Sequence, residues 1–154
     1  RLAFVPVPFD APLTHVTVQR FLPDGRHFIV GTHPGWLHYY RLERDGSRQW
    51  AVATAKVRVP NVHLGGECGL IGLAIDPDFS TNRYVYASHC VSNTHGAVTR
   101  LTFDERDPEG TTASAVEIIR RGDDGHLQVP IHNISALGFD EEKNLWALLG
   151  DKYN

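Results

Sequence analysis

The chain has 154 residues and a net charge of −3, a balance that does not favour nucleic acid or an anionic membrane surface as a general partner. Hydrophobic residues make up 42% and charged residues 21%, as is typical of a globular domain, and no apolar run approaches the roughly 20 residues of a membrane span. Fourteen glycines and nine prolines indicate a chain with many turns.

The first predicted unit occupies about residues 10–60. Its opening segment alternates polar and apolar side chains, as a strand with one buried face does, and Asp24-Gly25 then forms a turn into a partner strand. The four expected strands cover residues 14–21, 27–31, 36–42 and 50–59. Consecutive short strands joined by tight turns predict a four-stranded antiparallel sheet.

The second unit, about residues 64–120, has the same order of signals. A glycine-rich segment leads into an apolar run, and the turn Asp76-Pro77-Asp78 separates this run from the next strand. The strands of this unit are expected over residues 70–75, 84–88, 97–103 and 116–119, and a third unit begins at about residue 130 with strands near 137–139 and 145–149. No stretch shows a sustained helical period.

Three turns of the same kind recur along the chain. Taking Asp24, Asp78 and Glu142 as equivalent positions gives spacings of 54 and 64 residues. Repetition at this distance is typical of an architecture with one small sheet per unit. We therefore predict an all-β fold, a β-propeller of four-stranded antiparallel blades with about three blades in this chain.

The repeat also predicts where a site should form. Thr14, Cys68 and His132 each lie ten residues before one of the three turn acids, and His15 and Glu67 are neighbours of the first two. Because inner strands of a propeller enter the central channel side by side, these residues are expected to meet at one mouth of the channel. The prediction follows from the repeat and not from a local motif.

Two segments resemble a known family. Residues 66–79 are similar to the G-x-x-G-L-L-x-[hydrophobic]-A-[hydrophobic]-x-P-D-F signature of the glucose/sorbosone dehydrogenases, and residues 132–151 are similar to that family's H-x-x-x-x-L-x-F segment with its later Gly-Asp pair. The family contains pyrroloquinoline-quinone-dependent sugar dehydrogenases, and hedgehog-interacting proteins share the domain. The resemblance implies six blades, so that this chain would hold about half of a propeller. Closure would need a second polypeptide, a second copy or the missing C-terminal half.

The resemblance also implies roles for individual residues. His132 would be the catalytic base for a sugar or polyol substrate, and Glu67 stands where those enzymes carry a Gln beside the substrate. Glu67 and His15 are the candidate substrate-binding residues. Pyrroloquinoline quinone and calcium are implied as cofactors, although the family's ligands for them lie mainly in later blades. Ile131 replaces the Asp that precedes the base in the glucose dehydrogenases.

Other interpretations of these residues remain open. His132 could instead bond the backbone at a strand start, and Glu67 could be a solvated loop acid. The histidines have no metal-ligand spacing, so no metal site is predicted from them. Two function classes therefore remain: a quinone-dependent sugar dehydrogenase, and a non-catalytic extracellular binding propeller.

The two cysteines permit a geometric prediction. If Ile75 pairs near Tyr84 across the turn, the same register places Cys68 opposite Cys90, within reach of a disulfide. Two buried free thiols are the alternative. A disulfide would fit a secreted or periplasmic protein. Because the chain begins with Arg1 and contains no Met, we also expect a processed or trimmed product.

Overall fold

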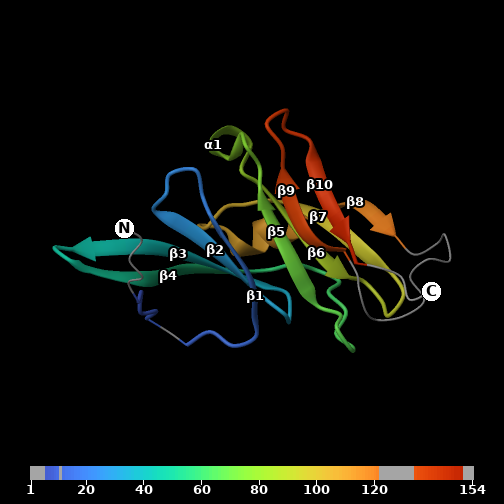
Figure 1. Ribbon diagram of the computed structural model, residues 1–154, viewed down its shortest axis with the longest axis horizontal. Coiled ribbons are helices and arrows are strands. Elements are labelled where there is room, and N and C mark those ends of the chain that lie inside the picture. Colours follow the sequence, from blue (N-terminus) through green and yellow to red (C-terminus); the bar gives the residue numbers. More distant parts are fainter. Residues whose placement is uncertain (1–5, 11, 122–133, 151–154) are drawn as a thin grey trace.

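The computed structural model describes residues 6–10, 12–121 and 134–150 (Figure 1). The strands are β1 (Val16–Phe21), β2 (His27–Thr32), β3 (Trp36–Asp45), β4 (Arg48–Arg58), β5 (Leu70–Ile75), β6 (Tyr84–Cys90), β7 (Gly96–Thr102), β8 (Val116–Arg121), β9 (Ile134–Phe139) and β10 (Leu145–Leu149). Two short helices, α1 (Phe79–Asn82) and α2 (Pro108–Ala113), lie in connections between strands. Among the described residues, no helix is long and apolar enough to cross a membrane.

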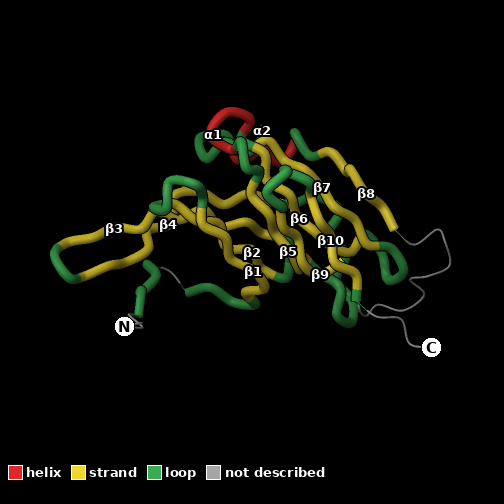
Figure 2. Tube along the Cα trace, turned by 45° about the horizontal axis from the view of Figure 1, so that its top comes forward, coloured by secondary structure: helices red, strands yellow, loops and turns green. Residues whose placement is uncertain are grey.

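The strands form three antiparallel sheets in chain order. The first sheet is β1-β2-β3-β4, the second is β5-β6-β7-β8, and the third, within the described residues, is the hairpin β9-β10. Figure 1 shows β1, β5 and β9 next to one another in the middle of the molecule. Figure 2 shows that strands make up most of the structure, with both helices at one end. The predicted all-β class with four-stranded antiparallel blades of a β-propeller is confirmed.

The spacings of the sequence repeat equal the spacings between the ends of the inner strands. β1, β5 and β9 end at Phe21, Ile75 and Phe139, which are 54 and 64 residues apart. β1 is shorter than predicted because His15 has a φ of 54°, outside the range of a strand. The first strand therefore begins at Val16 and not at residue 14.

Hydrophobic side chains fill the spaces between the sheets. The core between the first and second sheets consists of Leu22, Ile29, Leu37, Tyr39, Val57, Val59, Leu70, Leu73, Phe79, Val85, Ala87, Leu101 and Phe103. A smaller cluster of Ala74, Val98 and Leu137 joins the second sheet to the third. Both faces of the second sheet are thus in contact with a neighbouring sheet, as in a propeller.

Two glycines allow the inner strands to approach closely. A Cβ on Gly31 of β2 would lie 2.7 Å from side-chain atoms of both Leu70 and Val18. A Cβ on Gly72 of β5 would collide with the carbonyl oxygen of Ser135 in β9. The absence of side chains at these positions brings β1, β5 and β9 together, and the segments before β1 and β5 consequently lie at one end of the molecule.

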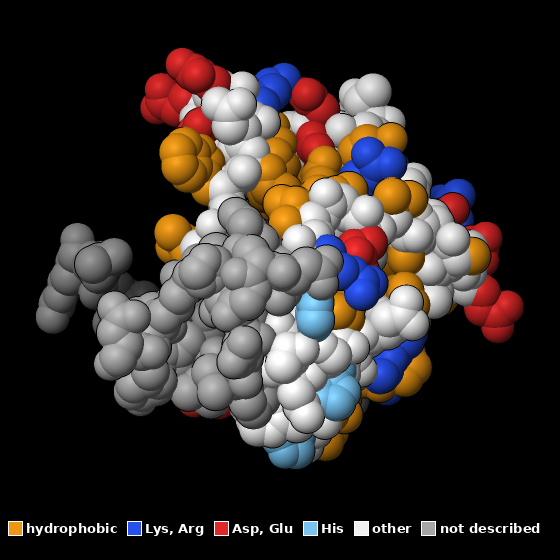
Figure 3. Space-filling view, turned by 90° about the vertical axis from the view of Figure 1, so that its right-hand side faces the viewer, with side chains coloured by type: hydrophobic (Ala, Val, Ile, Leu, Met, Phe, Trp, Pro, Cys, Tyr) orange, Lys and Arg blue, Asp and Glu red, His pale blue; other side chains and the backbone are white. Residues whose placement is uncertain are grey.

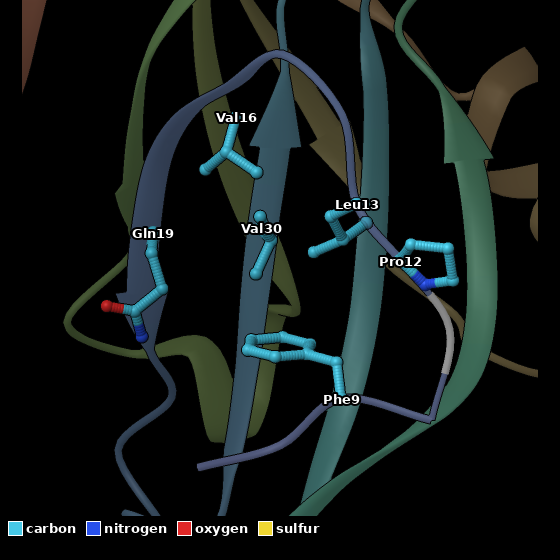
Figure 4. A pocket seen from close by; sticks show the side chains of 6 residues that line it. All are labelled: Phe9, Pro12, Leu13, Val16, Gln19 and Val30. Atoms are coloured by element: carbon cyan, nitrogen blue, oxygen red, sulfur yellow. The ribbon is translucent and has the colours of Figure 1, made fainter. Parts of the chain in front are cut away.

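The outer face of the first sheet is partly covered by the N-terminal segment. Phe9 bridges to Ala51 of β4, and its ring packs edge-on against the rings of Phe28 and Tyr40. A cavity of about 620 Å³ remains between this segment and the sheet (Figure 4). The cavity is lined by Phe9, Pro12, Leu13, Val16, Gln19 and Val30. Its lining is almost wholly apolar, so it does not suit a polyhydroxylated ligand.

Candidate functional site

The candidate site lies at the end of the molecule where β1 and β5 begin. We call this end the loop face and define it by residues 12–15, 33–35, 59–69 and 91–95. The backbone N–H of His33 donates to the carbonyl of His15 at 2.8 Å, and the N–H of Leu70 donates to the carbonyl of His33 at 2.9 Å. The first three segments are therefore held side by side, at the bottom of the molecule in Figure 1.

The predicted substrate-binding residues both lie on this face. His15 is exposed immediately before β1, as is Thr14. Glu67 is exposed in a tight turn closed by the N–H of Cys68 and the carbonyl of Gly65, 2.8 Å apart, with Gly66 at a φ of 57°. Their roles in binding stay predictions. His132 lies outside the described residues, so its place and its role as a base also stay predictions.

A disulfide holds the Glu67 turn against the second sheet. Cys68 and Cys90 are bonded, with Cα atoms 5.3 Å apart and both side chains fully buried. Cys90 also accepts the N–H of His63 at 2.8 Å and donates its own N–H to Gly69 at 3.1 Å. The pairing is the one predicted from the register around the Asp76 turn, and it leaves no free cysteine.

Sequence reasoning missed a polar pair on this face. His63 Nε2 lies 2.7 Å from Asn93 Oδ1, which joins the segment before β5 to the hairpin between β6 and β7. In the same hairpin, His95 Nδ1 lies within hydrogen-bonding distance of the hydroxyls of Ser92 (3.1 Å) and Thr94 (2.8 Å). No motif marks these residues, and the only available signal was the high count of nine histidines.

The histidines are unevenly distributed. His15, His33, His63 and His95 all belong to the loop face. Figure 3 agrees, since the pale-blue histidine side chains gather on the lower half of the side that it shows. His89, on β6, is buried, and burial lowers the pKa of its imidazole. Imidazoles and hydroxyls in this number make the loop face rich in hydrogen-bonding side chains.

The charge of the loop face limits what it can bind. Across its four segments, Glu67 is the one carboxylate and there is no Lys or Arg. No group of three or more His, Cys, Asp or Glu side chains in the described part of the chain could hold a metal ion. The face is therefore suited to hydroxyl groups, which donate and accept hydrogen bonds without charge, and poorly suited to an anion.

The opposite end of the molecule carries a structural polar cluster. The Asp76 carboxylate accepts hydrogen bonds from Asn82 Nδ2 and the Tyr86 hydroxyl, each at 2.9 Å. Burial, together with this bond to Asp76, raises the pKa of Tyr86 to about 12. Lys143 in the third sheet's turn pairs with Asp78 at 2.8 Å. These contacts connect the second and third sheets and are satisfied internally, so we assign them no ligand.

Comparisons with known proteins agree with this architecture. Residues 13–154 match the family model described as Glucose / Sorbosone dehydrogenase. The structure of the PQQ-bound form of aldose sugar dehydrogenase from Streptomyces coelicolor matches with a TM-score of 0.72 and 23% sequence identity, covering 93% of this chain and 40% of that chain. This chain therefore spans well under half the length of that enzyme. No curated protein sequence matches.

Proposed function

Because the chain belongs to the glucose/sorbosone dehydrogenase family, we propose that it is part of a pyrroloquinoline-quinone-dependent dehydrogenase that oxidises a sugar or polyol. The single observation that carries the proposal is the family match over residues 13–154. The quinone in the aldose sugar dehydrogenase of similar fold and the polar loop face, which has no Lys or Arg in its four segments, support it. The alternative, a non-catalytic extracellular binding propeller, would use the same face for its ligand.

In the proposed reaction, the sugar is oxidised at a hydroxyl-bearing carbon, and the quinone, when bound by the complete protein, would supply the acceptor for the hydride. The proton of the same hydroxyl passes to His132, which acts as the base. Imidazole suits this role because its unperturbed pKa of about 6.5 leaves it mostly neutral at pH 7. Glu67 would accept a hydrogen bond from a sugar hydroxyl, since an ionised carboxylate can only accept.

The loop face does not fit the quinone or calcium. A quinone that carries carboxylates needs cationic partners, and the loop face has no Lys or Arg in its four segments. No metal-binding cluster occurs within the described residues either. We therefore assign the loop face to the sugar, and any quinone or calcium site to other residues of the complete protein.

The disulfide bears on where the protein is located, and the partial match to the aldose sugar dehydrogenase bears on what completes the propeller. Disulfides persist in oxidising compartments, so the Cys68–Cys90 bond supports a secreted or periplasmic location. The match covers 40% of the aldose sugar dehydrogenase chain. We therefore propose that a second polypeptide, a second copy or further C-terminal residues complete the propeller.

The test is turnover by the complete assembly, supplied with quinone and calcium, with an artificial electron acceptor. His132→Ala should lower sugar oxidation by about 10²–10⁴-fold, the usual cost of losing a general base, while quinone binding persists. His27→Ala is the matched control, because His27 bonds Asp24 at the end of the first sheet opposite the loop face. Unchanged turnover in His132→Ala would eliminate this residue as the base. No turnover in the wild type would favour the binding propeller.

A further inference from the structure

Two neighbouring segments of the loop face form a rigid frame. Residues 63–69 are attached to Cys90 by the disulfide and by backbone bonds at both ends, from His63 and to Gly69. Residues 91–95 continue directly from Cys90 and turn tightly, with the N–H of Val91 donating to the carbonyl of His95 at 2.9 Å. Side chains on this frame therefore have defined positions relative to one another.

The His63–Asn93 pair leaves a donor and an acceptor unused. Asn93 Oδ1 can only accept, so the proton in the 2.7 Å bond belongs to His63 Nε2. In the neutral imidazole, Nδ1 is then an acceptor. Within the described part of the chain, neither His63 Nδ1 nor Asn93 Nδ2 has a hydrogen-bond partner. Asn93 is exposed and His63 is half-buried, so a ligand can reach both.

Gly65 connects this pair to Glu67. A Cβ on Gly65 would lie 2.9 Å from Asn93 Oδ1 and 3.2 Å from His63 Nε2, so the pair rests directly on the glycine backbone. Gly65 and Glu67 belong to the same tight turn, closed by Cys68. Leu64, 50% exposed, adds an apolar contact beside them. The frame thus combines a neutral acceptor, a neutral donor, a carboxylate and an apolar side chain.

We propose that His63 and Asn93 form a hydroxyl-binding subsite that helps to determine which sugar or polyol is accepted. His63 Nδ1 accepts a hydrogen bond from one hydroxyl, and Asn93 Nδ2 donates to the oxygen of a second. Hydroxyl groups meet both needs because each donates and accepts, whereas an anion would find no cation on this face. The inference rests on the proposed function, since it assigns the sugar to the same face.

Two substitutions remove the hydrogen-bonding groups of the subsite but leave the disulfide and the backbone of the frame unchanged. His63→Gln keeps an amide N–H for Asn93 but removes the Nδ1 acceptor, and Asn93→Ala removes the donor. In the complete assembly, each should raise KM for glucose or sorbitol by about three- to tenfold with kcat nearly unchanged, because a neutral hydrogen bond to the substrate is lost. His27→Gln, at the opposite end of the first sheet, should leave KM and kcat unchanged.

Two glycine substitutions, one beside the subsite and one away from it, test the geometry of the His63–Asn93 pair. Gly65→Ala pushes the His63–Asn93 pair apart and should also raise KM, whereas a Cβ on Gly138 of β9 meets nothing within 4 Å, so Gly138→Ala should have no effect. A cooperative thermal unfolding transition like that of the wild type, together with an intact Cys68–Cys90 disulfide, identifies the variants that fold. If His63→Gln does not fold, the exposed Asn93→Ala variant decides.

Calorimetric titration with glucose and with sorbitol keeps the two proposals distinct. Turnover with KM values equal to wild type in His63→Gln and Asn93→Ala would overturn the subsite and leave the dehydrogenase proposal standing. Sugar binding that weakens in these variants, without turnover in the wild type, would support the subsite and overturn the dehydrogenase. An assembly that neither binds nor oxidises these probes would overturn the subsite along with the sugar assignment.

Discussion

His89 is a buried histidine whose ring is fully hydrogen-bonded as a neutral group. Its Nδ1 donates to the carbonyl of Cys90 at 3.1 Å, so its Nε2 accepts from the hydroxyl of Thr99 at 2.9 Å. Burial lowers the pKa of His89, and the hydrogen bond to the Cys90 carbonyl and the nearby Glu117 only partly offset this. The folded protein therefore holds His89 neutral, beside the loop face but without contact to solvent.

This arrangement predicts acid sensitivity. Because the pKa of His89 is lower in the folded state, the unfolded chain binds more protons below its own pKa of about 6.5. The contribution of His89 to the free energy of unfolding should be fully present above about pH 6.5 and be lost as the pH falls through the folded-state pKa. Denaturant unfolding between pH 5 and 8 should show a flatter pH dependence for His89→Gln than for wild type. Parallel curves would contradict the prediction.

At the scale of elements, an aspartate stabilises the connection that follows each inner strand, β1, β5 and β9. Asp24, Asp76 and Asp140 each accept one hydrogen bond from a backbone N–H within the turn. Each also forms a second hydrogen bond, with a side chain that comes later in the chain. Asp140 also accepts Trp146 Nε1 at 2.8 Å, and this bond is the main reason that the pKa of Asp140 falls to about 2. The sequence repeat was detectable because these turns need an acid at the end of each inner strand.

The sequence predicted the turns better than the individual acids. The sequence repeat aligns Asp78 and Glu142 with Asp24, but the residues that make the equivalent bonds are Asp76 and Asp140. The acid occupies a different place in each turn, since Asp76 directly follows β5 whereas Asp24 lies three residues beyond β1. A uniform offset counted along the chain could not detect that difference.

Short-range signals and long-range contacts explain what the sequence could and could not predict. The strands and the Cys68–Cys90 pairing follow from alternation and from register around one turn. The helices α1 and α2 are too short, at four and six residues, to show a helical period. His63 and Asn93 are 30 residues apart, and only the folded second sheet brings them together.

Removing the disulfide should destabilise the protein without changing its sheet topology. The bond closes a loop with a sequence separation of 22, for which chain entropy predicts a loss of about 3 kcal/mol in the free energy of unfolding. The double variant Cys68→Ala, Cys90→Ala should unfold at lower denaturant concentration than oxidised wild type. Adding a reductant should lower the wild-type midpoint and leave that of the variant unchanged. Equal midpoints for the oxidised wild type and the variant would refute the stabilising role.

At the scale of the whole molecule, the two ends of the row of sheets differ. The first sheet has the N-terminal segment against its outer face, through Phe9. On the third sheet, Trp146 and Leu148 are 62% and 61% exposed, and β10 pairs only with β9 among the described strands. Val116 and Ile118 of β8 are also exposed. Figure 3 shows hydrophobic side chains, in orange, gathered on the upper part of this side.

This uncovered side suits a further strand. An open strand edge offers unpaired backbone groups, and large exposed apolar side chains beside it favour association. A strand placed next to β10 would pair with its edge, and the sheet so extended would cover Val116 and Ile118. With the added strand, the third sheet would be closer in strand number to the first and second sheets, which have four strands each. This agrees with the proposal that another segment or polypeptide completes the propeller.

The chain expressed alone should therefore associate with itself through this side. Burying a leucine side chain contributes about 1.5–3 kcal/mol, so Leu148→Lys should weaken self-association by tenfold or more. Leu64→Lys is the matched control, because Leu64 is comparably exposed, at 50%, but lies on the loop face away from the edge of β10. Light scattering over a range of protein concentrations measures the association in each case. A wild-type chain that stays monomeric at every concentration without a partner would show that the uncovered side is stable in water, and equal weakening by both variants would show that the association does not use β10.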